Sequence, residues 1–383
     1  GLVGSEMCIR DRRTELKYLS ALDFKTISEK QLVNKQMKIN EVLKYARTLN
    51  QHTQLYDILK HRLINKGYIR SDKQKEDLND LVLSELHLIA NNSYQGFEAQ
   101  KLHLLFQATY YLNSGNYKSA IRYYQELINL FNDNQHLILN PPIYYLSAIQ
   151  GILDSLCIAG LYHETPFFLS KLEELTQNEY STEFILHLKT LIYIYKSNSL
   201  LQAGNFEQAL ELRDKQENEL LKKVTSLGLE SQLRLYLSFA VLGMYTKDYV
   251  QARKYMKKIF SLGKLFCAFP SYKIARLVNL LLQAELGNYD FFKNEIISIK
   301  RNIRFEKQTY ITEKLIFKFI QGYPLPSYEK ARNKRWLQYQ KDIQKIEQDK
   351  YERQLLKTFD VLAWIESKLT QRSLADIFAE KAH

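Results

Sequence analysis

The stretch that decides the fold is Leu102 to Phe131, LHLLFQATYYLNSGNYKSAIRYYQELINLF. Apolar and small residues recur three and four positions apart in both halves of it: Leu104, Ala108, Tyr111 and Leu112, then Tyr117, Ala120, Ile121, Tyr124 and Leu127. This spacing is typical of one face of an α-helix. Gly115 separates the halves, and glycine accepts the left-handed conformation that ends a helix. Because the turn is short, we expect two antiparallel neighbouring helices.

The same residues resemble the tetratricopeptide repeat, a helix-turn-helix unit of about 34 residues. With Gly115 as the turn glycine, six residues fall on signature positions of that family: Leu104, Ala108, Tyr111, Tyr117, Ala120 and Tyr124. A methyl group at Ala120 would allow the ~8–10 Å helix separation of tight packing. Two signature residues differ, because Leu104 replaces the family's early Trp and Asn132 replaces its closing Pro.

Similar turns recur along the chain. They lie near Gly160, Gly204, Lys247 and Gly287, at intervals of 40 to 45 residues counted from Gly115. An aromatic residue follows each turn position by two residues, at Tyr117, Tyr162, Phe206, Tyr249 and Tyr289. The small residue of the second helix is present as Ala120, Ala209 and Ala252 but is replaced by Thr165 and Phe292 in the other two units. The period is longer than the family's, so the resemblance is to a divergent array.

These observations predict an all-α fold, an α-solenoid of about five tetratricopeptide-like hairpins with helical N- and C-terminal caps. Only 13 Gly and 6 Pro in 383 residues agree with an all-helical chain. We place an N-terminal helical region at residues 13–96, the repeat array at 97–300 and a basic C-terminal helical region at 301–383. The hydrophobic content of 45% suffices for a large core built by stacking units.

Residues 1–12, GLVGSEMCIRDR, have a different expected origin. The sequencing-adapter DNA AGATGTGTATAAGAGACAG reads in one frame as Met-Cys-Ile-Arg-Asp followed by Arg or Ser, which matches Met7 to Arg12. We interpret the segment as translated adapter on a fragmentary environmental reading frame, not native, and expect it to be disordered and dispensable. The natural N-terminus, with any signal peptide or leading domain, would then be missing.

The C-terminal region carries most of the positive charge. From Lys293 to Lys357 there are 16 Lys and Arg against 8 Asp and Glu, while the whole chain has a formal charge of +12. The densest run supplies the candidate phosphate contacts Lys330, Arg332, Lys334 and Arg335. The alternative is a solvated helix with its own ion pairs, such as Lys345–Asp349 and Asp349–Arg353 at i,i+4. We favour the solvated helix and do not expect nucleic acid as a partner.

No pattern indicates catalysis. The eight His form no HExxH motif, and the chain has no phosphate-binding loop, GxGxxG or GxSxG motif. We therefore expect no catalytic residues, no metal site, no cofactor and no enzymatic activity. Cys157 and Cys267 are far apart and in apolar surroundings, without a CxxC motif. A reducing cytoplasm is the expected location, and no apolar run reaches the ~18–20 residues of a membrane span.

The resemblance implies a non-enzymatic protein-interaction scaffold that binds a peptide or helix in a concave groove lined by the first helix of each hairpin. The family's groove positions correspond here to Thr109, Asn113, Asp154, Asn198, Gln202 and Arg234. A stacked array offers a broad rigid surface, so a peptide binds without ordering the receptor. Two alternatives stay open: the ligand-sensing half of a regulator whose N-terminal domain is missing, and a nucleic-acid-binding helical protein that uses the basic C-terminal region.

Overall fold

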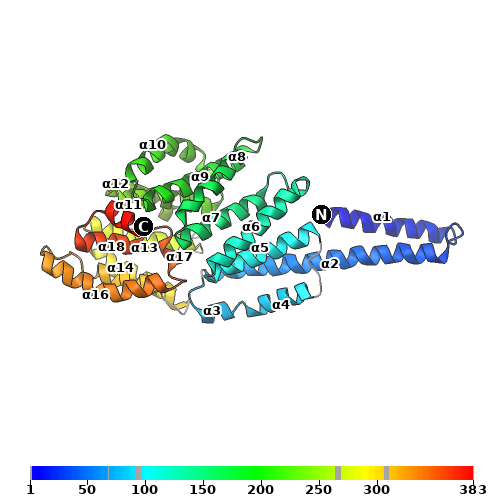
Figure 1. Cartoon of the computed structure of the whole chain (residues 1–383), viewed down its shortest axis with the longest axis horizontal. Coiled ribbons are helices and arrows are strands. Elements are labelled where there is room, and N and C mark those ends of the chain that lie inside the picture. Colours follow the sequence, from blue (N-terminus) through cyan, green and yellow to red (C-terminus); the bar gives the residue numbers. More distant parts are fainter. Residues whose placement is uncertain (1, 68, 91–95, 264–268, 306–309, 383) are drawn as a thin grey trace.

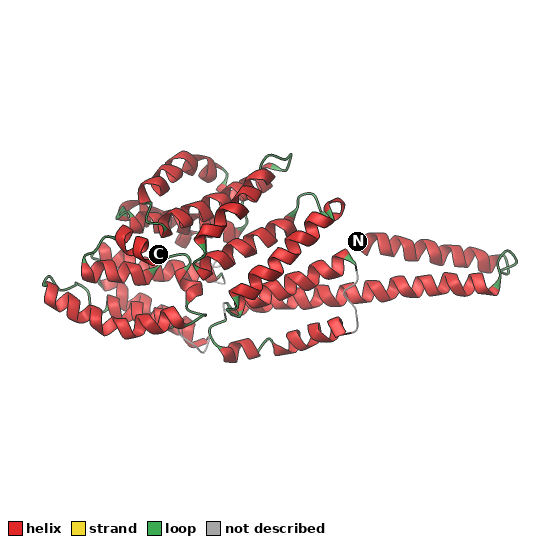
Figure 2. Ribbon diagram, viewed as in Figure 1, coloured by secondary structure: helices red, strands yellow, loops and turns green. Residues whose placement is uncertain are grey.

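The computed structural model describes residues 2–67, 69–90, 96–263, 269–305 and 310–382. This part of the chain consists of helices and their connections, with no β-strand (Figure 2). The prediction of an all-α fold is therefore confirmed. Buried apolar side chains between Leu49 and Phe378 form one continuous core, so the helices pack against their neighbours rather than standing alone.

The predicted turns separate pairs of consecutive helices (Figure 1). The pairs are α5 (Phe97–Asn113) and α6 (Tyr117–Asp133), α7 (Ile143–Ala159) and α8 (Thr165–Leu175), α9 (Thr182–Gln202) and α10 (Phe206–Lys222), α11 (Leu229–Tyr245) and α12 (Tyr249–Ser261), and α13 (Pro270–Glu285) and α14 (Asp290–Phe305). Short 3-10 turns, η1 (Gln135–Leu137), η2 (Tyr162–Glu164) and η3 (Val224–Ser226), precede α7, α8 and α11. We call α5, α7, α9 and α11 the first helices.

Left-handed residues end the helices at these turns, as the glycine pattern predicts. Gly115 has φ 78°, and Lys247 takes the equivalent conformation with φ 61°. Ala120, Ala209 and Ala252 are completely buried, which agrees with a close approach of two helices at each of them. A second close approach is at Gly151 of α7, where an added Cβ would lie 2.2 Å from Cζ of Tyr124 on α6.

The N-terminal region is built around one long helix. The sequence has two apolar stripes at helical spacing, Ile39, Val42, Leu43 and Ala46, and then Leu55, Ile58, Leu59 and Leu63, which stop near Gly67. Both belong to α2 (Glu29–Lys66), which is 38 residues long and has Gly67 as its C-cap. Its start carries a capping box between Ser28 and Gln31. Two shorter helices follow, α3 (Asp72–Glu76) and α4 (Asn79–Ala90), and α2 packs against α4 and α5. With α1 (Leu2–Ala21), α2 forms a hairpin that projects from the rest of the molecule (Figure 1).

The expectation of disorder for residues 1–12 is wrong for residues 2–12, which begin α1. Backbone hydrogen bonding propagates a helix in both directions from a packed segment, and α1 is anchored beyond residue 12. Leu19 is buried, and the carboxylate of Glu15 lies 2.6 Å from Nζ of Lys35 on α2.

The C-terminal region folds back over the row of turns. It contains α15 (Ile311–Ile320), α16 (Glu329–Gln348), α17 (Arg353–Leu356), α18 (Val361–Thr370) and α19 (Leu374–Ala382). The Tyr117 hydroxyl donates to the carbonyl of Lys350 at 2.5 Å, beside the first turn. At the third turn, an added Cβ on Gly204 would lie 3.0 Å from the carbonyl oxygen of Ala375. At the fifth turn, Nζ of Lys368 lies 2.5 Å from the carboxylate of Glu285.

Residues 349–360 join α16 to α18 and run past the first helices. We call them the 349–360 connection.

Candidate functional site

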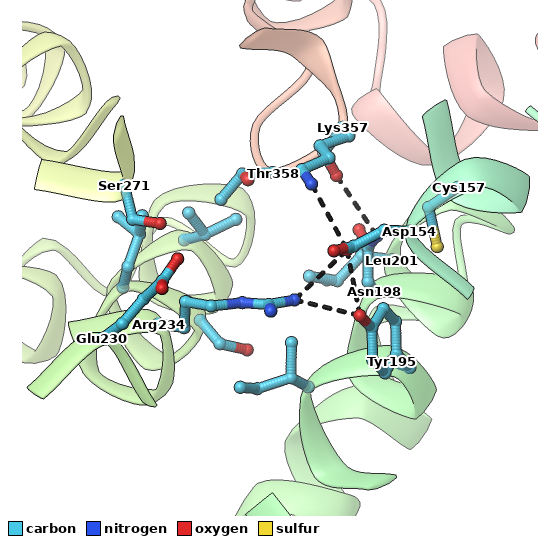
Figure 3. A pocket seen from close by; sticks show the side chains of 14 residues that line it. Asp154, Cys157, Tyr195, Asn198, Leu201, Glu230, Arg234, Ser271, Lys357 and Thr358 are labelled. Atoms are coloured by element: carbon cyan, nitrogen blue, oxygen red, sulfur yellow. Dashed lines mark hydrogen bonds and ion pairs between the residues drawn. The ribbon is translucent and has the colours of Figure 1, made fainter. Parts of the chain in front are cut away.

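Three consecutive first helices bring polar side chains to one place. Asp154 lies on α7, Tyr195 and Asn198 lie on α9, and Arg234 lies on α11. α9 packs against both α7 and α11, so residues about 40 positions apart in sequence become neighbours. Lys357 and Thr358 of the 349–360 connection complete the arrangement from the other end of the chain (Figure 3).

Asp154 is the centre of this cluster. Its Oδ1 lies 3.3 Å from Nη2 of Arg234 and 3.3 Å from Nζ of Lys357. The Tyr195 hydroxyl donates to the same oxygen at 2.9 Å and accepts from Nη2 of Arg234 at 3.1 Å. The three charged side chains are only 14–17% exposed. A carboxylate this deeply buried is stable when it is paired and hydrogen-bonded, as Asp154 is.

Burial and this ion pairing shift the pKa values of several groups in the cluster. Burial alone would raise the pKa of Asp154, but Lys357, Arg234 and the Tyr195 hydrogen bond outweigh it and hold that pKa below its usual value. Burial and the neighbouring Asp154 raise the pKa of the Tyr195 hydroxyl well above 10. The same two causes raise the pKa of the Cys157 thiol to about 12, so the thiol stays protonated at neutral pH and is a poor nucleophile.

The connection is held through its main chain as well as through Lys357. Nδ2 of Asn198 donates to the carbonyl of Lys357 at 3.2 Å. Nε2 of Gln354 donates to the carbonyl of Asn113 at 3.3 Å, at the end of α5. Farther along, the main-chain N–H of Asp360 donates to the Tyr245 hydroxyl at 2.6 Å. Contacts between a side chain and a main-chain group are the ones that bind polypeptide without regard to its sequence.

A cavity of about 80 Å³ remains between the first helices and the connection. Polar groups line one part of it, among them Glu230 and Arg234 of α11, Ser271 of α13 and Thr358. Aliphatic side chains line the other part, including Leu201 and Val241. Figure 3 shows Glu230, Arg234, Ser271 and Thr358 around the same space. The cavity is therefore a small polar pocket with an apolar wall.

The six predicted groove residues divide into two groups. Asp154, Asn198 and Arg234 all line the cavity. Thr109, Asn113 and Gln202 do not. Thr109 accepts, through its carbonyl, from Nδ2 of Asn113 at 2.8 Å. Gln202 is half-buried at the end of α9.

Several residues of the cluster were missed from the sequence. Glu230 precedes Arg234 by four residues, a spacing that places both on one helix face, and Tyr195 precedes Asn198 by three. That local signal was available. Lys357, Thr358 and Ser271 had no such signal, because they reach the site only through the way the chain folds back.

The four candidate phosphate contacts are not all exposed on the surface. Lys330 and Lys334 are exposed. Arg332 is buried and donates to the carbonyls of Pro326 and Ser327, and Nη1 of Arg335 donates to the carbonyl of Gly322 at 2.8 Å. Two of the four cations are therefore used to hold the loop before α16.

The described part of the chain contains no group of three or more His, Cys, Asp or Glu side chains placed to hold a metal ion. No described helix combines the length and the apolar character needed to cross a membrane. Cys267 lies outside the described residues. Comparison with protein-family models, with curated proteins and with solved structures yields no match to this chain.

Proposed function

We propose that the chain is an α-solenoid of about five tetratricopeptide-like hairpins and serves as a non-enzymatic scaffold that binds polypeptide along its first helices. The observation that carries the proposal is the capture of the 349–360 connection by residues at the predicted groove positions. Asn198 binds its main chain, and Asp154 binds the side chain of Lys357. The same groups offer a partner peptide a side-chain amide that donates to a main-chain carbonyl and a carboxylate that selects a basic side chain.

The internal segment then acts as a built-in competitor. A tethered segment has an effective concentration in the millimolar range, so a peptide of similar sequence added in solution binds weakly unless the tethered copy is loosened. A natural partner would have to bind more tightly than the connection or bind where the connection leaves the first helices uncovered. Loosening the internal contact should therefore reveal the binding activity.

The test uses a labelled peptide with the sequence of Asp349–Asp360, DKYERQLLKTFD, and the full chain. In the chain, Lys357→Ala removes the ion pair to Asp154 and weakens the internal contact. We expect this variant to bind the peptide at least about tenfold more tightly than wild type does, since a charge-assisted hydrogen bond contributes roughly 1.5–3 kcal/mol. Lys341→Ala, an exposed site on α16, is the matched control and should behave like wild type.

An altered peptide provides a second control. A version with alanine at the position of Lys357 should lose most of the affinity, because it cannot pair with Asp154. If neither chain binds the peptide at millimolar concentration, or if the altered peptide binds equally well, the first helices do not bind polypeptide in this way.

The nucleic-acid alternative has less support. Phosphate binding needs several cations free on one surface, and Arg332 and Arg335 donate to carbonyls of the loop before α16. Only Lys330 and Lys334 of the four remain exposed.

A further inference from the structure

Two oppositely charged groups face the cavity with hydrogen-bonding capacity to spare. Arg234 uses only Nη2 in its contacts with Asp154 and Tyr195. Within the described residues, its Nε and Nη1 have no hydrogen-bond partner, and neither does the carboxylate of Glu230. Both side chains line the cavity.

The separation of this pair has a physical cause. Glu230 and Arg234 are four residues apart on α11, the spacing at which an ion pair normally forms on a helix. No ion pair joins them in the described structure, because the guanidinium group is drawn to the buried Asp154. An ion pair is stronger in the less polar surroundings of Asp154 than at Glu230, which is exposed. The cavity therefore has a positive group and a negative group that do not neutralise each other directly.

The size of the cavity limits what can occupy it. Sites for drug-sized ligands have volumes of about 300–1,000 Å³, and an engineered cavity of about 150 Å³ holds benzene. A cavity of about 80 Å³ has room for only a few heavy atoms. The part of a ligand that the cavity encloses is therefore small.

Charge selects among small ligands. A simple carboxylate would pair with Arg234 but would be repelled by Glu230 and Asp154. A simple amine would pair with Glu230 but would be repelled by Arg234 and Lys357. A zwitterion satisfies both groups. The hydroxyls of Ser271 and Thr358 can bond the ligand carboxylate, while Leu237 and Val241 form an apolar wall for a short aliphatic group.

We propose that this cavity is a binding site for a small α-amino acid of the size of glycine, alanine or serine. Its carboxylate binds Arg234, its ammonium group binds Glu230, and its side chain meets the apolar wall. The site lies between α11 and the 349–360 connection. A bound amino acid would therefore bridge the two and stabilise the closed arrangement by mass action. This ligand site shares Arg234 and part of its lining with the predicted polypeptide groove. The inference concerns a different ligand and does not depend on the binding of polypeptide.

The test measures binding of glycine, L-alanine and L-serine to the full chain by calorimetry, with thermal unfolding as a second readout. N-acetylglycine keeps the carboxylate and lacks the ammonium group. Glycinamide keeps the ammonium group and has an uncharged amide in place of the carboxylate. We expect at least one of the three amino acids to bind with a Kd below about 10 mM and to raise Tm. Both analogues should bind at least about tenfold more weakly, because each loses a charge-assisted contact. L-phenylalanine should also bind more weakly, since its ring exceeds the cavity.

Glu230→Gln is the informative variant, because Glu230 is exposed and its loss should leave the Tm of the unliganded protein unchanged. It should weaken amino-acid binding at least about tenfold. Glu207→Gln, the same change at an exposed site on α10, should leave binding unaltered. The proposal is overturned if none of the three amino acids binds below about 10 mM, if N-acetylglycine binds as well as glycine, or if Glu230→Gln binds as wild type does.

Discussion

Asp154 shows how a single residue joins distant parts of the chain. Its carboxylate is 16% exposed and contacts side chains from α9, α11 and the 349–360 connection. Burying a charge is unfavourable, and here two cations and a hydroxyl offset that cost. Removing the carboxylate would leave Arg234 and Lys357 buried together without their shared anion.

The contribution of Asp154 should depend on pH in a defined direction. Its pKa is lower in the folded state than its usual value of 3.8, so its stabilising effect is present above about pH 4 and is lost as pH falls through the folded-state pKa. We expect Asp154→Asn to lower the free energy of unfolding by about 3 kcal/mol at pH 7. The difference from wild type should shrink below pH 4. Urea unfolding at pH 7, 5 and 3.5 checks this, and a difference that grows on acidification would contradict it.

Gly151 tests the closeness of α6 and α7. An alanine Cβ at this position would lie 2.2 Å from Cζ of Tyr124, whose ring is buried. Alanine gains about 1 kcal/mol in helix propensity over glycine, but overpacking normally costs about 1–3 kcal/mol. At this separation we expect overpacking to win, and Gly151→Ala should lower the denaturant midpoint. In a Tyr124→Leu background the ring is gone, so the same change should become neutral or stabilising. Equal effects in both backgrounds would exclude the clash.

At the scale of single residues, the sequence predicts which residues share a face of one helix. It does not predict which distant residues contact that face. Asp154, Asn198 and Arg234 were predicted because they fall on positions that the resemblance to the tetratricopeptide repeat assigns to the groove. Lys357 lies 203 residues beyond Asp154, and its local sequence gives no sign that its ammonium group will be buried against a carboxylate.

Among the elements, the second helices were predicted through their small residues. Ala209 is completely buried on α10, which packs against α9. Ala209→Leu should therefore overpack this crossing and lower the free energy of unfolding by about 1–3 kcal/mol. The neighbouring exposed residue provides the control, because Gln208→Leu should change it by no more than about 0.5 kcal/mol. Unfolding of Ala209→Leu at the wild-type denaturant midpoint would mean that no tight crossing exists there.

The N-terminal helices show a limit of reading elements from sequence. The apolar stripes and the stop at Gly67 were visible, yet both stripes belong to one helix of 38 residues. No glycine or proline interrupts residues 29–66, and this absence was the available signal for a continuous helix. The start of α1 was missed because residues 2–12 were judged by their expected origin rather than by their helix propensity.

Deletion of residues 1–12 should still leave Tm unchanged within about 2 °C. The described contacts that fix α1 come from Glu15 and Leu19, and both remain in the shortened chain. Thermal unfolding of the two proteins side by side checks this. A loss of several degrees would show that the first turns of α1 stabilise the fold.

At the scale of the whole molecule, the partners of the C-terminal region could not be predicted from the sequence. Its charge predicted a solvated helix, and α16 is indeed mostly exposed. The following residues instead join the core, where Trp364 and Ile365 are completely buried. Phe359 stacks on Tyr245 at 5.0 Å between ring centroids. Such contacts between residues more than 100 positions apart leave no periodic trace in a single sequence, so only the fold shows that the 349–360 connection contacts the first helices.

The measurement that tests this internal capture most directly is a double-mutant cycle between Asp154→Asn and Lys357→Met. If α7 holds the 349–360 connection through this pair, the two changes should be coupled by about 1–3 kcal/mol in the free energy of unfolding. Asp154→Asn combined with Lys341→Met, at the exposed site on α16, should be additive within about 0.5 kcal/mol. Additivity of Asp154→Asn and Lys357→Met within the same 0.5 kcal/mol would contradict the capture of the connection by the first helices.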